Sequence, residues 1–515
     1  MGQSTETSAG LAGLRIDANS GEPVYRQIAE GIRDAARAGK LAAGTRLPPT
    51  RDLARQLGVN RNTVVAAYDL LAAEGVVHSH TGRGTFVAAQ NGAAPAVLAG
   101  APDTWSLGFS QALERPGVGN LLSVYNVGTS QEGISFAGSY PAADLMPVDA
   151  FRKAFADELR ERGAEVLSYG PSAGWGPLRE AIAAEMRRAG SRVGSGEILV
   201  TSGSQQGLEL IFRALLDPGD PIVIEDPTYT GALSALASLG ARLVGVPLDD
   251  DGVRPDLLEL AIERHRARLV YLQPSHHNPT TRVLSEPRRR EVLDIARRHG
   301  CAIVEDDWAK DLRFDGPQPP SLHALDGGAR VIYVSTYSKK LLPGLRIGWV
   351  CAPAPVLDRL VALKQIEDCG TSPLLQAALH RFVREGRLDE HLRRVRRAYA
   401  ERRDAMIGAL GRHIPPGASW ERPAGGLFLW LQLPAGLDSD ELFGAAQRRG
   451  VLFSRGQLFH VDGNGGRDAL RLTFAAASTE QIEAGVKVLG ELVRERAGSA
   501  AGPAVRRAAE TVPIL

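Results

Sequence analysis

The segment VIYVSTYSKKLLPGLRIGWV, residues 331–350, carries two adjacent lysines, Lys339 and Lys340, in a polar stretch that follows an apolar run. The run is rich in β-branched and aromatic residues, which predicts a buried strand. A lysine amine at the end of such a strand can attack a carbonyl group if its pKa is low enough to leave it uncharged. A like charge on Lys340 could depress the pKa of Lys339 in this way. The segment therefore indicates covalent chemistry on a lysine.

Two more predicted strands end in groups that could serve the same chemistry. CAIVEDDWAKD, residues 301–311, ends its apolar run in three carboxylates. ILVTSGSQQGLELIFRALL, residues 198–216, predicts a strand, a glycine-containing turn and a helix that starts at Gly203, Ser204 and Gln205. The free N–H groups and the dipole of a helix start favour a phosphate group. Because many strand–helix turns look alike, this turn gains weight only beside the lysine and the carboxylates.

Together these segments resemble the cofactor site of fold-type I aminotransferases, which use pyridoxal 5'-phosphate. The resemblance implies that Lys339, where the Ser-Lys and Arg spacings match, carries the cofactor in a Schiff base, with Lys340 as the local competitor. It implies that Asp306 faces the pyridine nitrogen, with Glu305 and Asp307 as less favoured candidates. The phosphate would be held by Thr336, Ser338, Arg346, Gly203, Ser204 and Gln205.

The same resemblance assigns four further side chains. Tyr229 would lie against the cofactor ring, although it could instead be a core or surface tyrosine. Asn278 would contact the cofactor hydroxyl, in a loop where Thr281 replaces the usual glycine. Trp308 occupies a position that is usually tyrosine, and an indole can donate a hydrogen bond but cannot accept or release a proton in the working range. Arg471 would bind the α-carboxylate of an amino acid, with an ion-paired structural arginine as the alternative.

Two other features of this region are assigned differently. The adjacent His276 and His277 have no carboxylate at a convincing metal-ligand spacing, so we expect no metal site. Tyr169 lies in SYGPSAGWGPLREAI, the segment that reaches the cofactor phosphate of the neighbouring subunit in dimers of the resembling family.

The N-terminal segment GTRLPPTRDLARQLGVNRNTVVAAYDLLAAEG, residues 44–75, predicts two short helices joined at Gly58. Thr50 can cap the first helix and Asn60 the second. In a helix-turn-helix the second helix lies in the major groove with its first residues at the base edges. Those residues would be Asn60, Arg61, Asn62 and Thr63, whose side chains form the hydrogen bonds that read bases.

The next segment, VVHSHTGRGTFVA, predicts a β-hairpin with Arg83 and Gly84 at its tip, where a cation suits phosphates or the minor groove. This order of elements resembles the GntR-type winged helix. We expect Thr50 and Arg51 of this chain to contact DNA as well. We expect His78 and His80 to line the wing without reading bases. The alternative is a three-helix packing module whose arginines are only solvated.

From residue 134 onward short β-branched runs alternate with long helical segments, which predicts an α/β fold, and a stretch rich in Ala, Gly and Pro separates this region from the N-terminal segment. We expect a winged helix-turn-helix over residues 20–88, a linker over 89–132, aminotransferase-like large and small domains over 133–496, and a disordered tail over 497–515. A net charge of +1 confines any nucleic-acid binding to a local patch, and the three cysteines show no disulfide or metal pattern. With no signal-peptide pattern and no apolar run of ~18 residues, we expect a cytoplasmic protein without membrane spans.

The combination of both halves resembles MocR/GabR-type transcription regulators. That resemblance implies a head-to-tail, domain-swapped homodimer that binds repeats in promoter DNA. An amino acid or amine effector would form an external aldimine, and the freed Lys339 and a re-ordered Arg471 would alter DNA affinity. Two alternatives remain: a working aminotransferase with a DNA-binding module, and a DNA-binding protein that has lost the cofactor. The effector, the operator sequence and the sign of regulation are not specified by the sequence.

Overall fold

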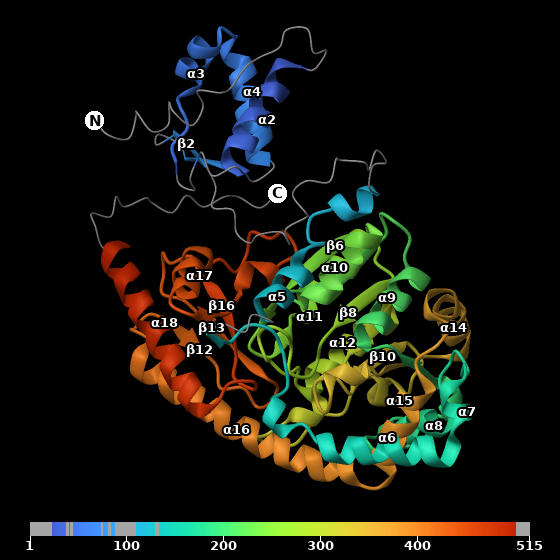
Figure 1. Cartoon of the computed structure of the whole chain (residues 1–515). Coiled ribbons are helices and arrows are strands. Elements are labelled where there is room, and N and C mark those ends of the chain that lie inside the picture. Colours follow the sequence, from blue (N-terminus) through green and yellow to red (C-terminus); the bar gives the residue numbers. More distant parts are fainter. Residues whose placement is uncertain are drawn as a thin grey trace. The chain divides into compact units, whose positions relative to one another are not determined.

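The computed structural model describes residues 23–37, 41, 45–73, 76–80, 84–87, 110–128 and 133–500 (Figure 1). The chain divides into two compact units, residues 1–108 and 109–515. Among the described residues no helix is long and apolar enough to cross a membrane.

The first unit is a small helical domain with a two-stranded hairpin. Its elements are α2 (Val24–Arg37), α3 (Thr50–Leu57), α4 (Arg61–Ala73), β1 (Val77–His80) and β2 (Gly84–Val87). Apolar residues at helical spacing, among them Ile28, Ile32, Val64 and Leu71, are buried and form its core. Gly58 ends α3 in the left-handed region, and the antiparallel strands pair Val77 with Val87 and His80 with Gly84. The predicted helix-turn-helix and wing are confirmed.

Thr50 does not cap α3 as we expected. The helix begins at Thr50 itself, and Pro49 occupies the capping position without a side-chain hydrogen bond. Pro49 is extended, which is the conformation that its ring allows outside a helix. Asn60, in contrast, accepts a hydrogen bond from the backbone N–H of Asn62 at 2.9 Å, as a capping side chain does.

Part of the predicted linker is folded onto the second unit. Residues 110–128 form η1 (Gln111–Glu114) and α5 (Asn120–Gly128), which pack on α10 (Thr230–Leu239). Arg115 donates to the carbonyl oxygen of Ser238 at 2.6 Å, and Ser234 donates to that of Gly117 at 2.8 Å. These two helices could not be predicted from the sequence because the apolar residues of the segment follow no sustained helical period.

An eight-stranded sheet with the order β4-β11-β10-β9-β8-β5-β6-β7 forms the centre of the second unit. The strands are β4 (Ile198–Thr201), β5 (Pro221–Asp226), β6 (Arg242–Asp249), β7 (Gly252–Val253), β8 (Leu269–Leu272), β9 (Ala302–Asp306), β10 (Val331–Thr336) and β11 (Gly348–Cys351). β6, β5, β8, β9 and β10 are parallel, and β11 runs against both of its neighbours. The carboxyl ends of the parallel strands therefore meet at one edge, where open α/β sheets bind ligands.

Helices cover both faces of this sheet. They include α6 (Val148–Arg162), α7 (Ala164–Leu167), α8 (Gly176–Arg188), α9 (Ser204–Leu215), α11 (Pro255–His265), α12 (Glu286–Arg298), α13 (Leu322–Asp326), α14 (Ala354–Asp368) and α15 (Pro373–Arg384). Because both faces are covered, β8 and β10 are buried along their whole length, and their sequences are continuous apolar runs rather than alternating ones.

A small lobe completes the second unit. Its antiparallel sheet has the order β12 (Ser419–Trp420), β13 (Phe428–Gln432), β16 (Ala469–Thr473) and β15 (Ser454–Arg455). Figure 1 shows α16 (Arg387–His413) and α18 (Thr479–Ala500) side by side along its outside, near α17 (Ser439–Arg448). β3 (Ile134–Ser135) pairs with β14 (Val451–Leu452) of this lobe. α18 enters the predicted tail, and residues 501–515 lie outside the described residues.

Candidate cofactor site

A cavity opens at the carboxyl edge of the large sheet. Open α/β sheets bind their ligands at this edge. Eight side chains singled out from the sequence line it together: Ser204, Tyr229, Asn278, Asp306, Trp308, Thr336, Lys339 and Arg471. Strand ends, the start of α9 and the loops between them bring these residues into one place from distant parts of the chain.

Lys339 follows β10 and points its amine into the cavity. Its Nζ donates to the carbonyl oxygen of Ser139 at 2.8 Å. Burial, together with the positive charges of Arg471 and Arg346, lowers the pKa of Lys339 to about 8. A large fraction of this amine is therefore uncharged, and nucleophilic, at mildly basic pH.

Lys340 faces away from the cavity and has a structural role. Its buried Nζ contacts Asp311 at 2.6 Å and Glu185 at 2.9 Å, and although burial opposes it, these carboxylates raise the pKa of Lys340. The expectation that Lys340 depresses the pKa of Lys339 is wrong, because two carboxylates neutralise its charge. Burial and two arginines lower the pKa of Lys339 instead.

Asp306 ends β9 and presents one unsatisfied oxygen. Its Oδ2 accepts a hydrogen bond from Tyr271 Oη at 2.8 Å, whereas its buried Oδ1 has no partner within the described residues. Burial raises the pKa of Asp306 to about 7, the Tyr271 hydrogen bond opposes this, and the Asp307 charge adds to it. A protonated ring nitrogen would give Oδ1 its missing donor and favour the ionised carboxylate. This site fits the pyridine ring of the cofactor.

Of the two neighbouring carboxylates, Glu305 is engaged through both oxygens, whereas Asp307 keeps one buried oxygen, Oδ1, without a partner among the described residues. Glu305 accepts hydrogen bonds from the backbone N–H groups of Leu322 and His323, both at 2.8 Å. Asp307 accepts one from Tyr333 Oη at 2.9 Å. Neither Glu305 nor Asp307 lines the cavity, so the geometry favours Asp306 as the ring-nitrogen partner.

The phosphate candidates converge where α9 begins. Gly203 precedes the helix with a φ of +91°, and a Cβ on it would lie 2.3 Å from Arg346 Nη2. Arg346 donates to the carbonyl oxygen of Ser202 at 3.1 Å and to Ser338 Oγ at 3.3 Å. The Ser338 N–H in turn donates to Thr336 Oγ1 at 3.0 Å. A helix start, two hydroxyls and one guanidinium thus form an anion cradle, and only a glycine leaves it open.

The Gln205 side chain is directed elsewhere. Its Nε2 donates to the carbonyl oxygen of Gly231 at 2.8 Å, and its Oε1 accepts from Tyr229 Oη at 3.1 Å. Gln205 does not line the cavity. Its side chain holds Tyr229 in place, a role that the helix-start pattern did not predict.

Arg471, in the middle of β16, is a buried cation without a carboxylate partner among the described residues. Its Nη1 donates to Asn278 Oδ1 at 2.8 Å, its Nη2 donates to the Gly138 carbonyl oxygen at 3.0 Å, and its Nε is buried without a partner in that part of the chain. Burial lowers the pKa of Arg471 to about 9. The alternative of an ion-paired structural arginine is disfavoured, because a carboxylate has to come from outside.

Aromatic rings and one strained residue complete the walls. Trp308 stacks on Phe428 with a centroid distance of 5.6 Å, and its buried Nε1 has no partner in the described structure. Thr281, which replaces a glycine of the resembling motif, has a φ of +64°. A β-branched residue in the left-handed region costs roughly 1–3 kcal/mol, so the loop keeps a backbone form that suits glycine better.

Several lining residues carried no signal in the sequence: Leu121, Val124, Gly138, Ser139, Tyr140, Thr230 and Gln273. Ser139 acts through its backbone carbonyl, which no residue type reveals. Leu121 and Val124 lie on α5, in the stretch that we had assigned to the linker. Their apolar spacing was the one available hint, and it is too short to separate from chance.

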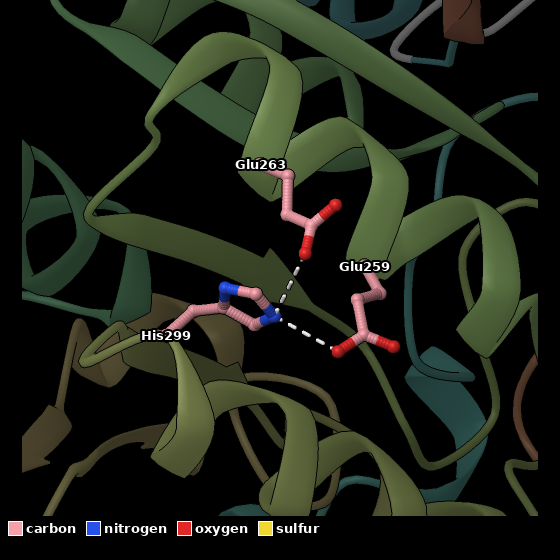
Figure 2. Close-up of side chains that lie close together, drawn as sticks. All are labelled: Glu259, Glu263 and His299. Atoms are coloured by element: carbon pink, nitrogen blue, oxygen red, sulfur yellow. Dashed lines mark hydrogen bonds and ion pairs between the residues drawn. The ribbon is translucent and has the colours of Figure 1, made fainter.

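The histidine pair is buried and uncharged. Burial lowers the pKa of both His276 and His277 to about 3, and His277 Nδ1 lies 2.8 Å from Thr280 Oγ1. Another cluster joins α11 to the end of α12 (Figure 2): His299 Nε2 lies 2.8 Å from Glu259 Oε1 and 3.7 Å from Glu263 Oε1. Because Arg298 also donates to Glu259 Oε1 at 2.6 Å, this cluster has the geometry of an ion-pair contact between helices.

The DNA-reading candidates of the first unit lie around the start of α4. Arg51, Asn60, Arg61 and Asn62 are exposed, whereas Thr50 and Thr63 are half-buried. Arg61 donates to Thr50 Oγ1 at 3.4 Å. Gly84 begins β2, and Arg83 lies outside the described residues.

Comparison with known proteins identifies both units. Residues 137–489 match the family described as aminotransferase class I and II, and residues 24–87 match bacterial regulatory proteins of the gntR family. The chain is 34% identical to an uncharacterized HTH-type transcriptional regulator, YisV, of Bacillus subtilis, over 92% of this chain and 96% of the relative. It is 35% identical to the probable rhizopine catabolism regulatory protein MocR of Rhizobium meliloti, over 87% and 90%.

A solved structure agrees over the second unit. It is LysN, the α-aminoadipate aminotransferase of Thermus thermophilus, in complex with N-(5'-phosphopyridoxyl)-L-leucine. The match has a TM-score of 0.72 and 36% identity, and covers 77% of this chain and all of LysN (100%). These matches, with the site geometry, identify the cofactor as pyridoxal 5'-phosphate.

The two lysines can be told apart by substitution. Lys339→Ala should abolish the near-visible absorbance of the bound cofactor and the borohydride-trapped adduct, because the attacking amine is lost. Lys340→Arg, which keeps a cation beside Glu185 and Asp311, should retain both signals. A normal spectrum in Lys339→Ala would show that another lysine carries the cofactor.

The depressed pKa of Lys339 predicts the pH dependence of its reactivity. Below about pH 8 the amine is protonated and cannot attack, and above it the amine is free. Labelling of the apoprotein by pyridoxal and borohydride, mapped to Lys339 by mass spectrometry, should be half-maximal near pH 8. In Arg471→Leu the midpoint should move to higher pH, since a like charge is removed. A midpoint close to about 10.4, as for lysine in water, would contradict the burial argument.

Proposed function

The chain belongs to the aminotransferase class I and II family and carries a GntR-type DNA-binding domain, and from this premise we propose that it is a transcription regulator that senses an amino acid or amine. The observation that carries the proposal is the pair of cations in one cavity. Lys339 offers a partly uncharged amine, and Arg471 offers a buried guanidinium with no carboxylate partner in the described structure. Such a cavity favours a ligand that brings both an amino group and a carboxylate.

The residues of the chain divide the work of holding the cofactor. Pyridoxal 5'-phosphate supplies an aldehyde that condenses reversibly with primary amines and a ring that withdraws electrons. Asp306 would hold the ring nitrogen through its free Oδ1. The cradle of Ser204, Thr336, Ser338 and Arg346 would hold the phosphate, and Asn278 would hold the hydroxyl.

A ligand at this site would change contacts that lead toward the N-terminal side of the unit. Arg471 donates to the Gly138 carbonyl oxygen and Lys339 donates to the Ser139 carbonyl oxygen, so two cations hold consecutive residues of one loop. A ligand carboxylate on Arg471 would compete for the first contact. Engagement of Lys339 by the cofactor would remove the second. This loop follows β3 and lies beside α5, whose Leu121 and Val124 line the same cavity.

We also propose that the regulator acts as a homodimer. Tyr169 is 94% exposed, and Leu167 and Ile366 are exposed as well. An interface at this position would cover these exposed side chains. Tyr169 would then be free to reach the partner's site, as the resemblance implies. Promoter DNA would bind through the helix-turn-helix of each subunit.

A working aminotransferase is the second candidate, because Lys339, Asp306 and Arg471 would serve catalysis as well as sensing. Trp308 favours the sensing role, since an indole cannot exchange a proton with the cofactor hydroxyl as a tyrosine can.

Footprinting on the protein's own promoter, paired with product analysis, separates the two functions. Amino acids should shift the cofactor spectrum and alter the footprint without sustained keto-acid production. Arg471→Leu should bind DNA normally in the absence of ligand but lose the response to amino acids, while amines that lack a carboxylate should still shift the spectrum. Sustained keto-acid release with an unchanged footprint would overturn the regulator and favour the enzyme.

Arg61 is expected to read a base. It is exposed at the start of α4, so Arg61→Ala should weaken binding to the specific operator by roughly 1–3 kcal/mol and leave non-specific binding nearly unchanged. Arg55→Ala is the matched control, because Arg55 is exposed on α3 and pairs with Asp52. Titration of specific and random duplexes at one salt concentration measures both affinities. An equal loss on every sequence would make Arg61 a phosphate contact.

A further inference from the structure

Lys364, on α14, is a buried lysine that does not line the cofactor cavity. Its side chain is 0% exposed, and its Nζ contacts Asp368 Oδ2 at 2.6 Å and Oδ1 at 2.9 Å. It also donates to Gln206 Oε1 at 2.9 Å. Burying an ammonium group costs several kcal/mol unless carboxylates and hydrogen bonds compensate it. An apolar side chain at this position would avoid the free-energy cost of burying a charge. The presence of a lysine therefore indicates a specific role for its charge.

The network around Lys364 extends to Ser202, as well as to Glu367, Gly370 and Thr371. The Ser202 N–H donates to Gln206 Oε1 at 2.7 Å, and its hydroxyl donates to Asp368 Oδ2 at 3.1 Å. Its carbonyl oxygen accepts from Arg346 Nη2 at 3.1 Å. Lys364 therefore holds both groups that fix the Ser202 N–H and hydroxyl, and all three polar groups of Ser202 are engaged.

Ser202 directly precedes the anion cradle. Gly203 turns the chain with a positive φ, and Ser204 begins α9 and lines the cavity. On the far side the turn is pressed against β11, since a Cβ on Gly348 would lie 2.7 Å from Ser204 N. The direction of the first N–H groups of α9 is thus set by β11 on one side and by the Ser202 network on the other.

We propose that Lys364 is a positioning residue for the cofactor phosphate: through Gln206 and Asp368 it fixes Ser202, and so aims the helix start of α9 at the anion. The inference concerns cofactor binding alone and holds whether the loaded protein regulates or catalyses. Its distinctive consequence is selectivity. A loosened turn should weaken binding of a phosphorylated ligand and leave the same ring without its phosphate unaffected.

Equilibrium dialysis of the full-length apoprotein with pyridoxal 5'-phosphate and with pyridoxal tests this. Lys364→Met, which keeps the unbranched chain and removes the charged end, should raise the Kd for pyridoxal 5'-phosphate by about 10-fold, comparable to the loss of one hydrogen bond to a charged group. The Kd for pyridoxal should change less than about 2-fold on the same scale. A purely structural role would lower the melting temperature and weaken both ligands alike.

Two further variants keep the test decisive if Lys364→Met does not fold. Ser202→Ala removes only the hydroxyl that contacts Asp368, and should give a smaller loss that is again selective for the phosphorylated ligand. Arg403→Met removes another buried cation, which pairs with Asp315 and Asp404, and should lower stability without selectivity. An unchanged ratio of the two dissociation constants in Ser202→Ala, and in Lys364→Met where it folds, would overturn the proposal.

Discussion

Two cations that share one cavity, the half-buried Lys339 and the buried Arg471, determine the electrostatics of the rest of the site. Neither has a carboxylate partner among the described residues, and each lowers its cost by donating to a backbone carbonyl. Burial lowers the pKa of Lys339 to about 8 and that of Arg471 to about 9. Because like charges in a poorly solvated space repel, the free energy of this site falls when an anion enters or when the lysine loses its proton. The reactivity of Lys339 toward aldehydes and the affinity of Arg471 for carboxylates thus both follow from the repulsion between these two cations.

The large sheet and the small lobe bring these charges together. Parallel strands deliver Asp306 and Lys339 to a common edge, whereas Arg471 arrives on an antiparallel strand of the other lobe. The phosphate end depends on a different balance. Arg346 and the start of α9 supply positive character there, and Lys364 with Asp368 stiffens the turn from behind without adding net charge to the cradle. On the proposed assignment, the cavity would have a fixed phosphate end and a ligand end whose contacts can be exchanged.

Residue type and spacing were enough to predict which side chains with reactive or polar groups meet in one cavity. Lys339, Asp306, Asn278 and Arg471 meet as the sequence predicted, and both domains have the predicted fold. What the sequence could not show depends on backbone atoms or on distant partners. Ser139 contributes a carbonyl, and the direction of Lys340 depends on Glu185, far away along the chain.

Predictions from local sequence rules, such as helix capping and helical periodicity, failed where a neighbouring residue or a packing partner determined the structure instead. Thr50 is a good capping type, yet Pro49 takes that position and Thr50 becomes the first helical residue. The apolar residues of α5 are too few to reveal a helix, and they are ordered by packing on α10. The sequence around Lys364 contains no motif that indicates a role for this residue, and its burial in the structure is what draws attention to it.

The pairing of β3 with β14 couples the position of β3 to that of the small lobe. Within the second unit the chain runs from residues 110–128, which pack on α10, to β3, and β3 is hydrogen-bonded to the small lobe. The same lobe bears Arg471, which lines the cavity. A shift of that lobe by even a fraction of a strand spacing would therefore pull on β3. The arginine at the cavity and the partner strand of β3 belong to one lobe, so that a movement of the first would be accompanied by a movement of the second.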